Sequence, residues 1–372
     1  MKYTVCLTQQ CNLRCSYCYI NKKESKLSIE TAKHIIDFVF KNTPADEKIE
    51  FGFFGGEPLL EYELMKKITQ TIEEHSLYNK EQIQISLVTN GTLYNEEIGQ
   101  FINEHNIIYC VSCDGPDYVQ DSFRCFQDGT GSSSTVSKNI QQAIKELPFV
   151  LVNSVYNPTT IEYLPEVVNY FINMGIKQVY LSPDISAKWS LNDTKIISEV
   201  FQKVAWKYID QYVAGDPRFI SLIDSKIALI LRGGYKPLER CRMGKGEFAF
   251  APSGNIYPCE RLIGSDDGIN HCIGNIYTGL NYLNMICHKI GDQEYNTECT
   301  SCSLKQYCMN WCGCTNFFTS GFYNRVSPFF CFLERTSIET AFNTYKVLEG
   351  KFGSLFMDHI AGNPELNSLE RN

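Results

Sequence analysis

The sequence predicts an α/β fold with a parallel sheet, followed by a smaller cysteine-rich domain. Three observations support this prediction: short β-rich apolar runs alternate with amphipathic helical patterns over residues 1–185, helical patterns fill 186–235, and closely spaced cysteines gather in 236–335. A last helical pattern, 336–348, opens the C-terminal helix and tail, 336–372. These ranges give the domain organisation that we expect.

The alternation of strands and helices defines the expected order of the sheet. The strand-like runs are 3–7, 49–54, 83–88, 107–112, 149–155 and 179–181. The helical patterns between them are 28–40, 62–75, 95–103, 134–147 and 161–174, and the linker adds 191–214 and 220–231. Parallel strands joined by helices form right-handed βαβ units, so we expect these strands to form one parallel sheet.

The composition excludes several classes of function. The 372 residues carry a net charge of −8 with a pI near 5.4, so no basic excess can neutralise phosphates and we expect no nucleic-acid partner. The chain opens without a signal sequence and contains no run of about 18 apolar residues, so we expect a cytoplasmic protein that does not enter a membrane. Because the cytosol keeps thiols reduced, the 17 cysteines indicate metal ligands rather than disulfides.

Cys11, Cys15 and Cys18 form a C-x3-C-x2-C run directly after the first predicted strand. A short loop with this spacing can turn three thiolates toward one point. A closed structural metal site uses four protein ligands, whereas three leave one position of an iron–sulfur cluster open. The run resembles the signature of the radical SAM enzymes. The alternative is structural zinc or a set of unrelated thiols.

The resemblance implies a fold and a cofactor chemistry. Radical SAM domains are partial (β/α)6 TIM-like barrels with the cysteine loop after the first strand. In this family the three thiolates hold a [4Fe–4S] cluster whose unique iron binds S-adenosylmethionine. An electron from the cluster then cleaves S-adenosylmethionine to a 5′-deoxyadenosyl radical, so we expect an external electron donor of the flavodoxin or ferredoxin type.

Residues at the expected strand ends resemble the family's contacts to S-adenosylmethionine. The motif Gly55-Gly56-Glu57-Pro58 matches the family's GGEP motif, which holds the methionyl amino group, and glycine allows close approach of the backbone. The resemblance assigns further contacts to Tyr17, Asn90, Ser112, Asp114, Arg124 and Ser154. Ordinary βα turns are the alternative for the loop residues, and a solvated helix pair with Asp121 is the alternative for the arginine.

A second cysteine pattern spans 241–331. It has the order C…G-x4-C…C-x2-C-x5-C-x3-C…C, which resembles the SPASM extension of radical SAM enzymes and implies two auxiliary [4Fe–4S] clusters, three clusters in all. The resemblance assigns one auxiliary cluster to Cys299, Cys302, Cys308 and Cys331, and three ligands of the other to Cys241, Cys259 and Cys312. The fourth ligand is Cys272 or is absent, and zinc is the inorganic alternative.

The resemblance also implies an enzyme that acts on a peptide or protein. We expect a maturase that abstracts hydrogen from a residue of a ribosomally made peptide and forms a thioether, a carbon–carbon crosslink or a related modification. The second hypothesis is oxidation of Cys or Ser to formylglycine, as in anaerobic sulfatase maturases, with Glu260 at the position of a proposed general base or as a plain loop glutamate. The third is a non-catalytic iron–sulfur or zinc protein that binds a partner.

Recognition of a leader peptide is expected to need another surface. Ten residues precede Cys11 and 41 follow Cys331, too few on either side for a leader-binding domain. We therefore expect either a separate leader-binding protein or the face of the barrel to recognise the substrate.

Overall fold

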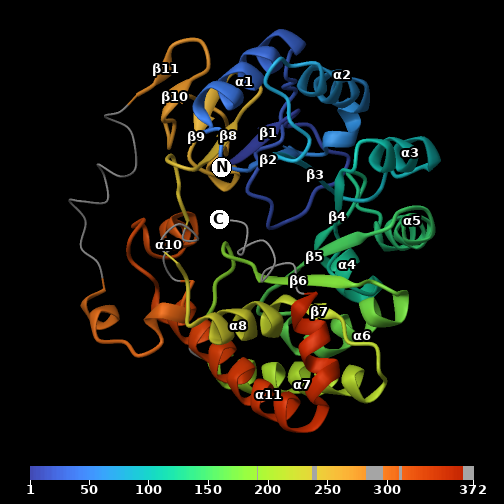
Figure 1. The fold of residues 1–372 in the computed structure, drawn as a ribbon, viewed down its shortest axis with the longest axis vertical. Coiled ribbons are helices and arrows are strands. Elements are labelled where there is room, and N and C mark those ends of the chain that lie inside the picture. The colour runs from blue at the N-terminus through green and yellow to red at the C-terminus, as the bar shows by residue number, and fades with distance from the viewer. Residues whose placement is uncertain (191, 237–240, 282–295, 310–311, 363–372) are drawn as a thin grey trace. The chain divides into compact units, whose positions relative to one another are not determined.

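The computed structural model describes residues 1–190, 192–236, 241–281, 296–309 and 312–362 (Figure 1). These residues form two compact units, each assembled from separate segments of the chain. The first unit comprises Met1–Ser112, Gln120–Val150 and the described part of 242–292. The second comprises Cys113–Val119, Leu151–Cys241 and the described part of 293–372.

The first unit is built on parallel strands that follow one another in chain order. They are β1 (Lys2–Cys6), β2 (Ile49–Phe54), β3 (Ile83–Thr89) and β4 (Ile108–Ser112), and each pairs in parallel with the next. Helices connect them: α1 (Ile29–Asn42), the short η1 (Pro58–Glu61), α2 (Tyr62–Glu73) and α3 (Glu96–Glu104), with α5 (Ser133–Glu146) after β4. The α/β fold with a parallel sheet predicted from the sequence is confirmed.

Local sequence explains where these helices begin. The hydroxyl of Ser28 accepts a hydrogen bond from the Thr31 amide at the start of α1, and the Asn95 side chain does the same for Ile98 at the start of α3. The apolar face of each helix then packs on strands whose large side chains, such as Phe53, are fully buried. In Figure 1, α1 and α2 lie side by side next to these strands.

A strand from the cysteine-rich part of the chain extends the same sheet. Strand β8 (Glu247–Phe250) pairs in parallel with β1, and it continues through antiparallel strands β9 (Asn255–Tyr257), β10 (Gly274–Asn275) and β11 (Gly279–Leu280). The 252–255 turn predicted from the sequence joins β8 to β9. Because β8 covers β1, the strand that leads into the three-cysteine loop is paired on both sides.

The second unit combines three parallel strands with a helical layer. The strands are β5 (Val150–Tyr156), β6 (Gln178–Pro183) and β7 (Phe219–Ile220). The helices are α6 (Leu164–Met174), α7 (Asp193–Val213), α8 (Ser221–Arg232), α10 (Gly313–Ser320) and α11 (Pro328–Ala361), and α7, α8 and α11 pack together (Figure 1). The helix predicted at 336–348 is the middle of the longer α11.

Several short elements complete the described residues. The helix α4 (Asp117–Phe123) runs from the second unit into the first and is absent from the elements that the sequence predicts. The 3-10 turns are η2 (Ile161–Tyr163), η4 (Glu260–Leu262), η6 (Thr297–Thr300) and η7 (Lys305–Tyr307). The last two carry or adjoin cysteines of the second pattern.

Candidate functional site

The three-cysteine loop follows β1 and is held by a second segment of the first unit. Cys11, Cys15 and Cys18 are half-buried cysteines outside any disulfide, and the Cys18 amide donates to the Cys15 carbonyl oxygen at 3.2 Å. Between these positions, the amides of residues 14 and 16 donate to carbonyl oxygens at 125 and 123, at 2.8 and 3.1 Å. These bonds fix the path of the loop backbone independently of its cysteine side chains.

The end of β3 reaches the same loop through side-chain amides. Asn90 is buried, and its Nδ2 lies 3.7 Å from Cys11 Sγ and 2.8 Å from Asn12 Oδ1. Asn12 Nδ2 donates in turn to Thr92 Oγ1 at 2.7 Å. The predicted site residue Asn90 therefore lies against a cysteine of the first pattern, whereas Asn12 and Thr92 are contacts that the sequence does not single out.

The two glycines of the GGEP motif pack against the backbone that leads into the cysteine loop. The amides of Gly56 and Glu57 donate to the carbonyl oxygens of Thr8 and Gln10, both at 2.8 Å. A Cβ on Gly55 would overlap the Thr8 carbonyl oxygen, and one on Gly56 would overlap that of Gln10. The close approach that glycine permits here is therefore made to the chain itself.

The Glu57 carboxylate is fully buried and accepts three hydrogen bonds from its own unit. Its Oε1 accepts from the Leu59 amide at 3.0 Å and from Thr89 Oγ1 at 2.7 Å, and its Oε2 accepts from the Asn90 amide at 2.7 Å. Burial raises the pKa of Glu57 above its ordinary value, while these hydrogen bonds and the charge of Arg124 oppose the rise. Pro58, also buried, begins η1 directly after this carboxylate.

Arg124 and Tyr17 meet beside the same loop. Arg124 is buried at 6% exposure, and its Nη1 donates to the Tyr17 hydroxyl at 2.8 Å. The Tyr17 ring packs on Phe123 with centroids 6.3 Å apart. Asp121, considered above as a solvated partner for the arginine, accepts from the Ser133 amide and hydroxyl at 2.8 and 2.6 Å. Arg124 is thus a buried cation that contacts the three-cysteine loop through Tyr17.

The remaining predicted contacts to S-adenosylmethionine divide between the units. Ser112 is the last residue of β4 in the first unit, while Asp114 and Ser154 are buried in the second. Asp114 Oδ1 accepts from the Val155 amide at 3.0 Å, and Ser154 Oγ donates to the Asp114 carbonyl oxygen at 3.2 Å. The structure therefore brings Asp114 and Ser154 together.

The four-cysteine segment belongs to the second unit. Cys299, Cys302 and Cys308 are half-buried around η6 and η7, and Cys331 lies in the first turns of α11. Burial raises the pKa of Cys299, and the neighbouring Cys331 and Cys302 raise it further.

One carboxylate ties this segment to the helical layer. Glu334, on α11, accepts from the Met309 amide at 2.6 Å and forms an ion pair with Lys226 of α8. Because Met309 directly follows Cys308, this contact anchors the cysteine segment to α8 and α11.

The cysteines assigned to the other auxiliary cluster have different surroundings. Cys241 and Cys312 lie in the second unit, and Cys259 and Cys272 in the first. Cys272 packs in an apolar cluster with Cys6 and Tyr257, among others, and its thiol donates to the Gly274 carbonyl oxygen at 3.1 Å.

A cysteine outside the predicted pattern lies next to one of these ligands. The Sγ of Cys314 is 3.5 Å from the Sγ of Cys312, and Cys314 is buried at the start of α10. Cys314 is not among the ligands predicted from the sequence, although its C-x-C spacing is an available signal.

Glu260 begins η4 directly after Cys259 and is half-buried. Burial raises the pKa of its carboxyl, but the charges of Lys2 and Arg261 outweigh burial, so the pKa lies below its ordinary value. The Cys259 thiol is 3.5 Å from Glu260 Oε2. Glu260 therefore lies beside a predicted ligand, with two cations that favour its charged form.

The donor chemistry of these sites fits iron–sulfur clusters. Cysteine thiols that are not in disulfides are the ligands that such clusters use. Within the ranges that the structure describes, no group of three or more His, Cys, Asp or Glu side chains is already arranged to hold a metal ion. The assignment of cysteines to clusters therefore rests on their spacing in the sequence and on the loops that carry them.

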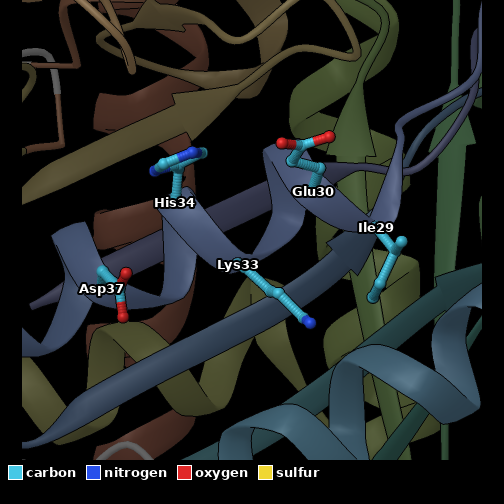
Figure 2. Close-up of a pocket in the computed structure, with 5 residues that line it drawn as sticks. All are labelled: Ile29, Glu30, Lys33, His34 and Asp37. Carbon is cyan, nitrogen blue, oxygen red and sulfur yellow. The ribbon is translucent and has the colours of Figure 1, made fainter.

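A surface hollow of about 520 Å³ lies on α1 (Figure 2). Its lining is Ile29, Glu30, Lys33, His34 and Asp37, all from one helix. Because one helix supplies the whole lining, the hollow does not bring polar groups from different elements together as a binding site does.

Among the helices that the structure describes, none is both long and apolar enough to cross a membrane.

Known proteins resemble this chain over most of its length. Residues 5–171 match the profile of the radical SAM superfamily. An uncharacterized protein of Methanocaldococcus jannaschii is 31% identical over 278 residues, covering 73% of this chain and 86% of that protein. A cysteine-type anaerobic sulfatase-maturating enzyme of Clostridium novyi is 23% identical over 327 residues, covering 82% of this chain and 85% of that enzyme.

A solved structure shares the fold. Native anSMEcpe with bound AdoMet and the Cp18Cys peptide superposes with a TM-score of 0.78 at 21% identity, covering 94% of this chain and 99% of that one. At this identity the likeness concerns the fold alone. Together with the profile match and the cysteine loop after β1, the sequence relatives place this chain in the radical SAM superfamily, whose enzymes use a [4Fe–4S] cluster and S-adenosylmethionine.

Proposed function

We propose that this chain is a maturase that modifies a residue of a ribosomally made peptide by radical chemistry, forming a thioether, a carbon–carbon crosslink or a related modification. The observation that carries the proposal is a three-cysteine loop braced by Glu57 and Asn90, followed later in the chain by the seven cysteines of the SPASM order. The sulfatase-maturating relatives and the peptide bound in the similar structure support a peptide or protein substrate.

In this proposal Cys11, Cys15 and Cys18 hold the cluster that binds S-adenosylmethionine. When bound and reduced, this cluster supplies the electron that splits S-adenosylmethionine into methionine and a 5′-deoxyadenosyl radical. The ligands of the auxiliary clusters are Cys299, Cys302, Cys308 and Cys331 for one, and Cys241, Cys259 and Cys312 for the other, with Cys272 as the candidate fourth ligand. The thiol–carbonyl bond and apolar packing of Cys272 favour an open position instead.

In this proposal the chain's own residues orient S-adenosylmethionine. Arg124 is a buried cation beside the loop and suits the methionyl carboxylate, and Tyr17 holds its guanidinium in place. Gly55 to Pro58 and Asn90 set the position of the loop. The side chains of Ser112, Asp114 and Ser154 are the candidates for the ribose.

A second candidate function is oxidation of Cys or Ser to formylglycine. The sulfatase-maturating relatives favour it, and Glu260 would then remove the substrate proton. Under either reaction we place the enzyme in the cytoplasm, with an external electron donor of the flavodoxin or ferredoxin type. A separate leader-binding protein would serve a substrate that carries a leader.

Anaerobic reconstitution with iron and sulfide tests the cofactor assignment. We expect about twelve irons per chain, from three clusters of four, and formation of 5′-deoxyadenosine with dithionite. Replacing Cys11, Cys15 and Cys18 by Ala should remove about four irons and abolish cleavage. Cys125→Ala, at a free cysteine outside both patterns, is the matched control and should keep all the iron. Stoichiometric zinc without cleavage would overturn the proposal in favour of a partner-binding protein.

Substrate assays separate the two reactions. The reconstituted enzyme is incubated with a sulfatase peptide that carries Cys or Ser, and with any short Cys-, Ser- or Thr-bearing precursor encoded beside its gene. Mass spectrometry then distinguishes an aldehyde from a crosslink. A crosslinked precursor supports the first function, and an aldehyde on the sulfatase peptide alone supports the second.

A further inference from the structure

Lys22 places a positive charge directly on the three-cysteine loop. Its Nζ lies 2.7 Å from Cys18 Sγ and 3.4 Å from the Ile20 carbonyl oxygen, and the side chain is half-buried. One of the three predicted ligands of the first cluster therefore lies in direct contact with this ammonium group.

The neighbouring lysine provides an internal contrast. Lys23 is exposed, and its Nζ donates to the Ser265 carbonyl oxygen at 2.7 Å. The two residues are adjacent and chemically identical, yet Lys22 contacts a thiol sulfur and Lys23 contacts a main-chain oxygen. The contact with a cysteine sulfur is thus specific to Lys22 and is not shared by the adjacent lysine.

We propose that Lys22 is a positioning residue that raises the reduction potential of the cluster held by Cys11, Cys15 and Cys18. This inference rests on the proposed function, because it requires iron at those thiolates. Hydrogen bonds to the sulfurs and net local charge are the protein's main means of setting such potentials. A reduced cluster carries one more negative charge than an oxidised one, so a fixed cation beside a ligand sulfur stabilises the reduced form.

The electron in this scheme comes from the external donor and enters the cluster. Lys22 breaks no bond and gives up no proton, and its ammonium lowers the free energy of the added negative charge. Partial burial of Lys22 and Cys18 strengthens the effect, because charges interact more strongly where water is excluded. The expected benefit is easier reduction of the first cluster by a physiological donor.

A redox titration followed by electron paramagnetic resonance tests the role without enzyme turnover. The signal of the first cluster is identified as the one missing from the variant with Ala at Cys11, Cys15 and Cys18. In Lys22→Met, the ratio of reduced to oxidised cluster at a fixed potential should fall about tenfold, which corresponds to about 59 mV for a one-electron couple. Lys22→Arg retains the charge and should restore most of the ratio, and Lys23→Met should leave it unchanged.

The controls separate this inference from the proposed function. Equal midpoints for Lys22→Met, Lys23→Met and the unaltered protein would overturn the role of Lys22 while leaving the cluster assignment intact. If Lys22→Met does not retain iron, Lys22→Gln keeps a hydrogen-bond donor without the charge and should show the same negative shift; an unshifted midpoint there also overturns the inference. An unchanged iron content in the triple Ala variant would instead refute the proposed function itself.

Discussion

The two cysteine-bearing segments of this chain are held in contrasting ways. The loop with Cys11, Cys15 and Cys18 is bonded to the 123–126 segment and to buried residues at the ends of neighbouring strands. The segment with Cys299, Cys302 and Cys308 consists of two 3-10 turns that contain no buried residue. Its described anchors to the helical layer include the contact between Glu334 and the Met309 amide.

The two segments differ in how much of their order comes from contacts within the protein. Fixing the backbone of a residue costs about 1–2 kcal/mol of conformational entropy, which buried contacts must offset. The first loop has such contacts within the protein. The turns around Cys299 and Cys302 have few, so what their thiolates bind should supply most of their order. We therefore expect the fold to order the first loop and a bound cluster to order the second segment.

Removal of iron should therefore act very unequally on the two segments. In the iron-free protein we expect amide exchange in 296–309 to accelerate by more than about tenfold, because a metal-bound segment loses its main source of order. Exchange in the loop that contains Cys11 should change by less than about twofold. Hydrogen exchange with mass spectrometry, compared before and after chelation, measures both. Similar acceleration in the two segments would show that the contrast does not hold.

The ion pair between Lys226 and Glu334 tests the protein's own anchor for the second segment. Both side chains are largely buried, at 8% and 15% exposure, so Lys226→Met leaves a carboxylate without its cation. We expect a loss of about 3 kcal/mol in the free energy of unfolding, measured by urea denaturation. The matched control is Lys207→Met on α7, whose pair with Asp210 is exposed and should contribute less than about 0.5 kcal/mol. Equal effects would show that this anchor contributes no more than a surface pair.

The sequence predicts some elements better than others for physical reasons. Strand β2 has the predicted bounds, since its apolar residues stand between clear helical patterns. The seven-residue α4 and the two-residue β7 are too short to show a period. The sequence predicts only the 336–348 part of α11, because only that part shows a regular apolar pattern.

The candidate site is only partly visible in the sequence. Cysteine spacing and the GGEP motif select residues by chemistry that is local to the chain. Asn12, Thr92 and Lys22 make their contacts only in the folded chain, and no sequence motif predicts these contacts. Burial is equally invisible: the sequence presents Glu57 as an acceptor for a ligand, whereas its carboxylate accepts from three donors of its own unit. Its role toward S-adenosylmethionine remains a prediction.

The glycine contact beside the first loop can be tested against a glycine that has space around it. In Gly56→Ala the new methyl group would meet the Gln10 carbonyl, which belongs to paired backbone, so we expect a destabilisation of about 2–3 kcal/mol. Gly350, on α11, is exposed, and a Cβ added there would meet no atom within 4 Å, so Gly350→Ala should stabilise by about 0.5–1 kcal/mol. Thermal unfolding measures both. A neutral Gly56→Ala would show that the loop backbone is free to move.

Glu57→Gln tests whether the first loop depends on a single buried acceptor. The substitution keeps the shape of the side chain but replaces one acceptor oxygen by an NH2 group. Because Oε1 and Oε2 both face donors, either orientation of the amide leaves at least one buried N–H or O–H without its acceptor. We expect a loss of about 2 kcal/mol in the free energy of unfolding and faster exchange at Asn90, with 296–309 unaffected. Glu63→Gln, at an exposed glutamate of α2, should cost less than about 0.5 kcal/mol. If the two variants lose the same amount of stability, the Glu57 carboxylate does not stabilise the first loop. The two cysteine segments would then differ only in the backbone hydrogen bonds that hold the first loop.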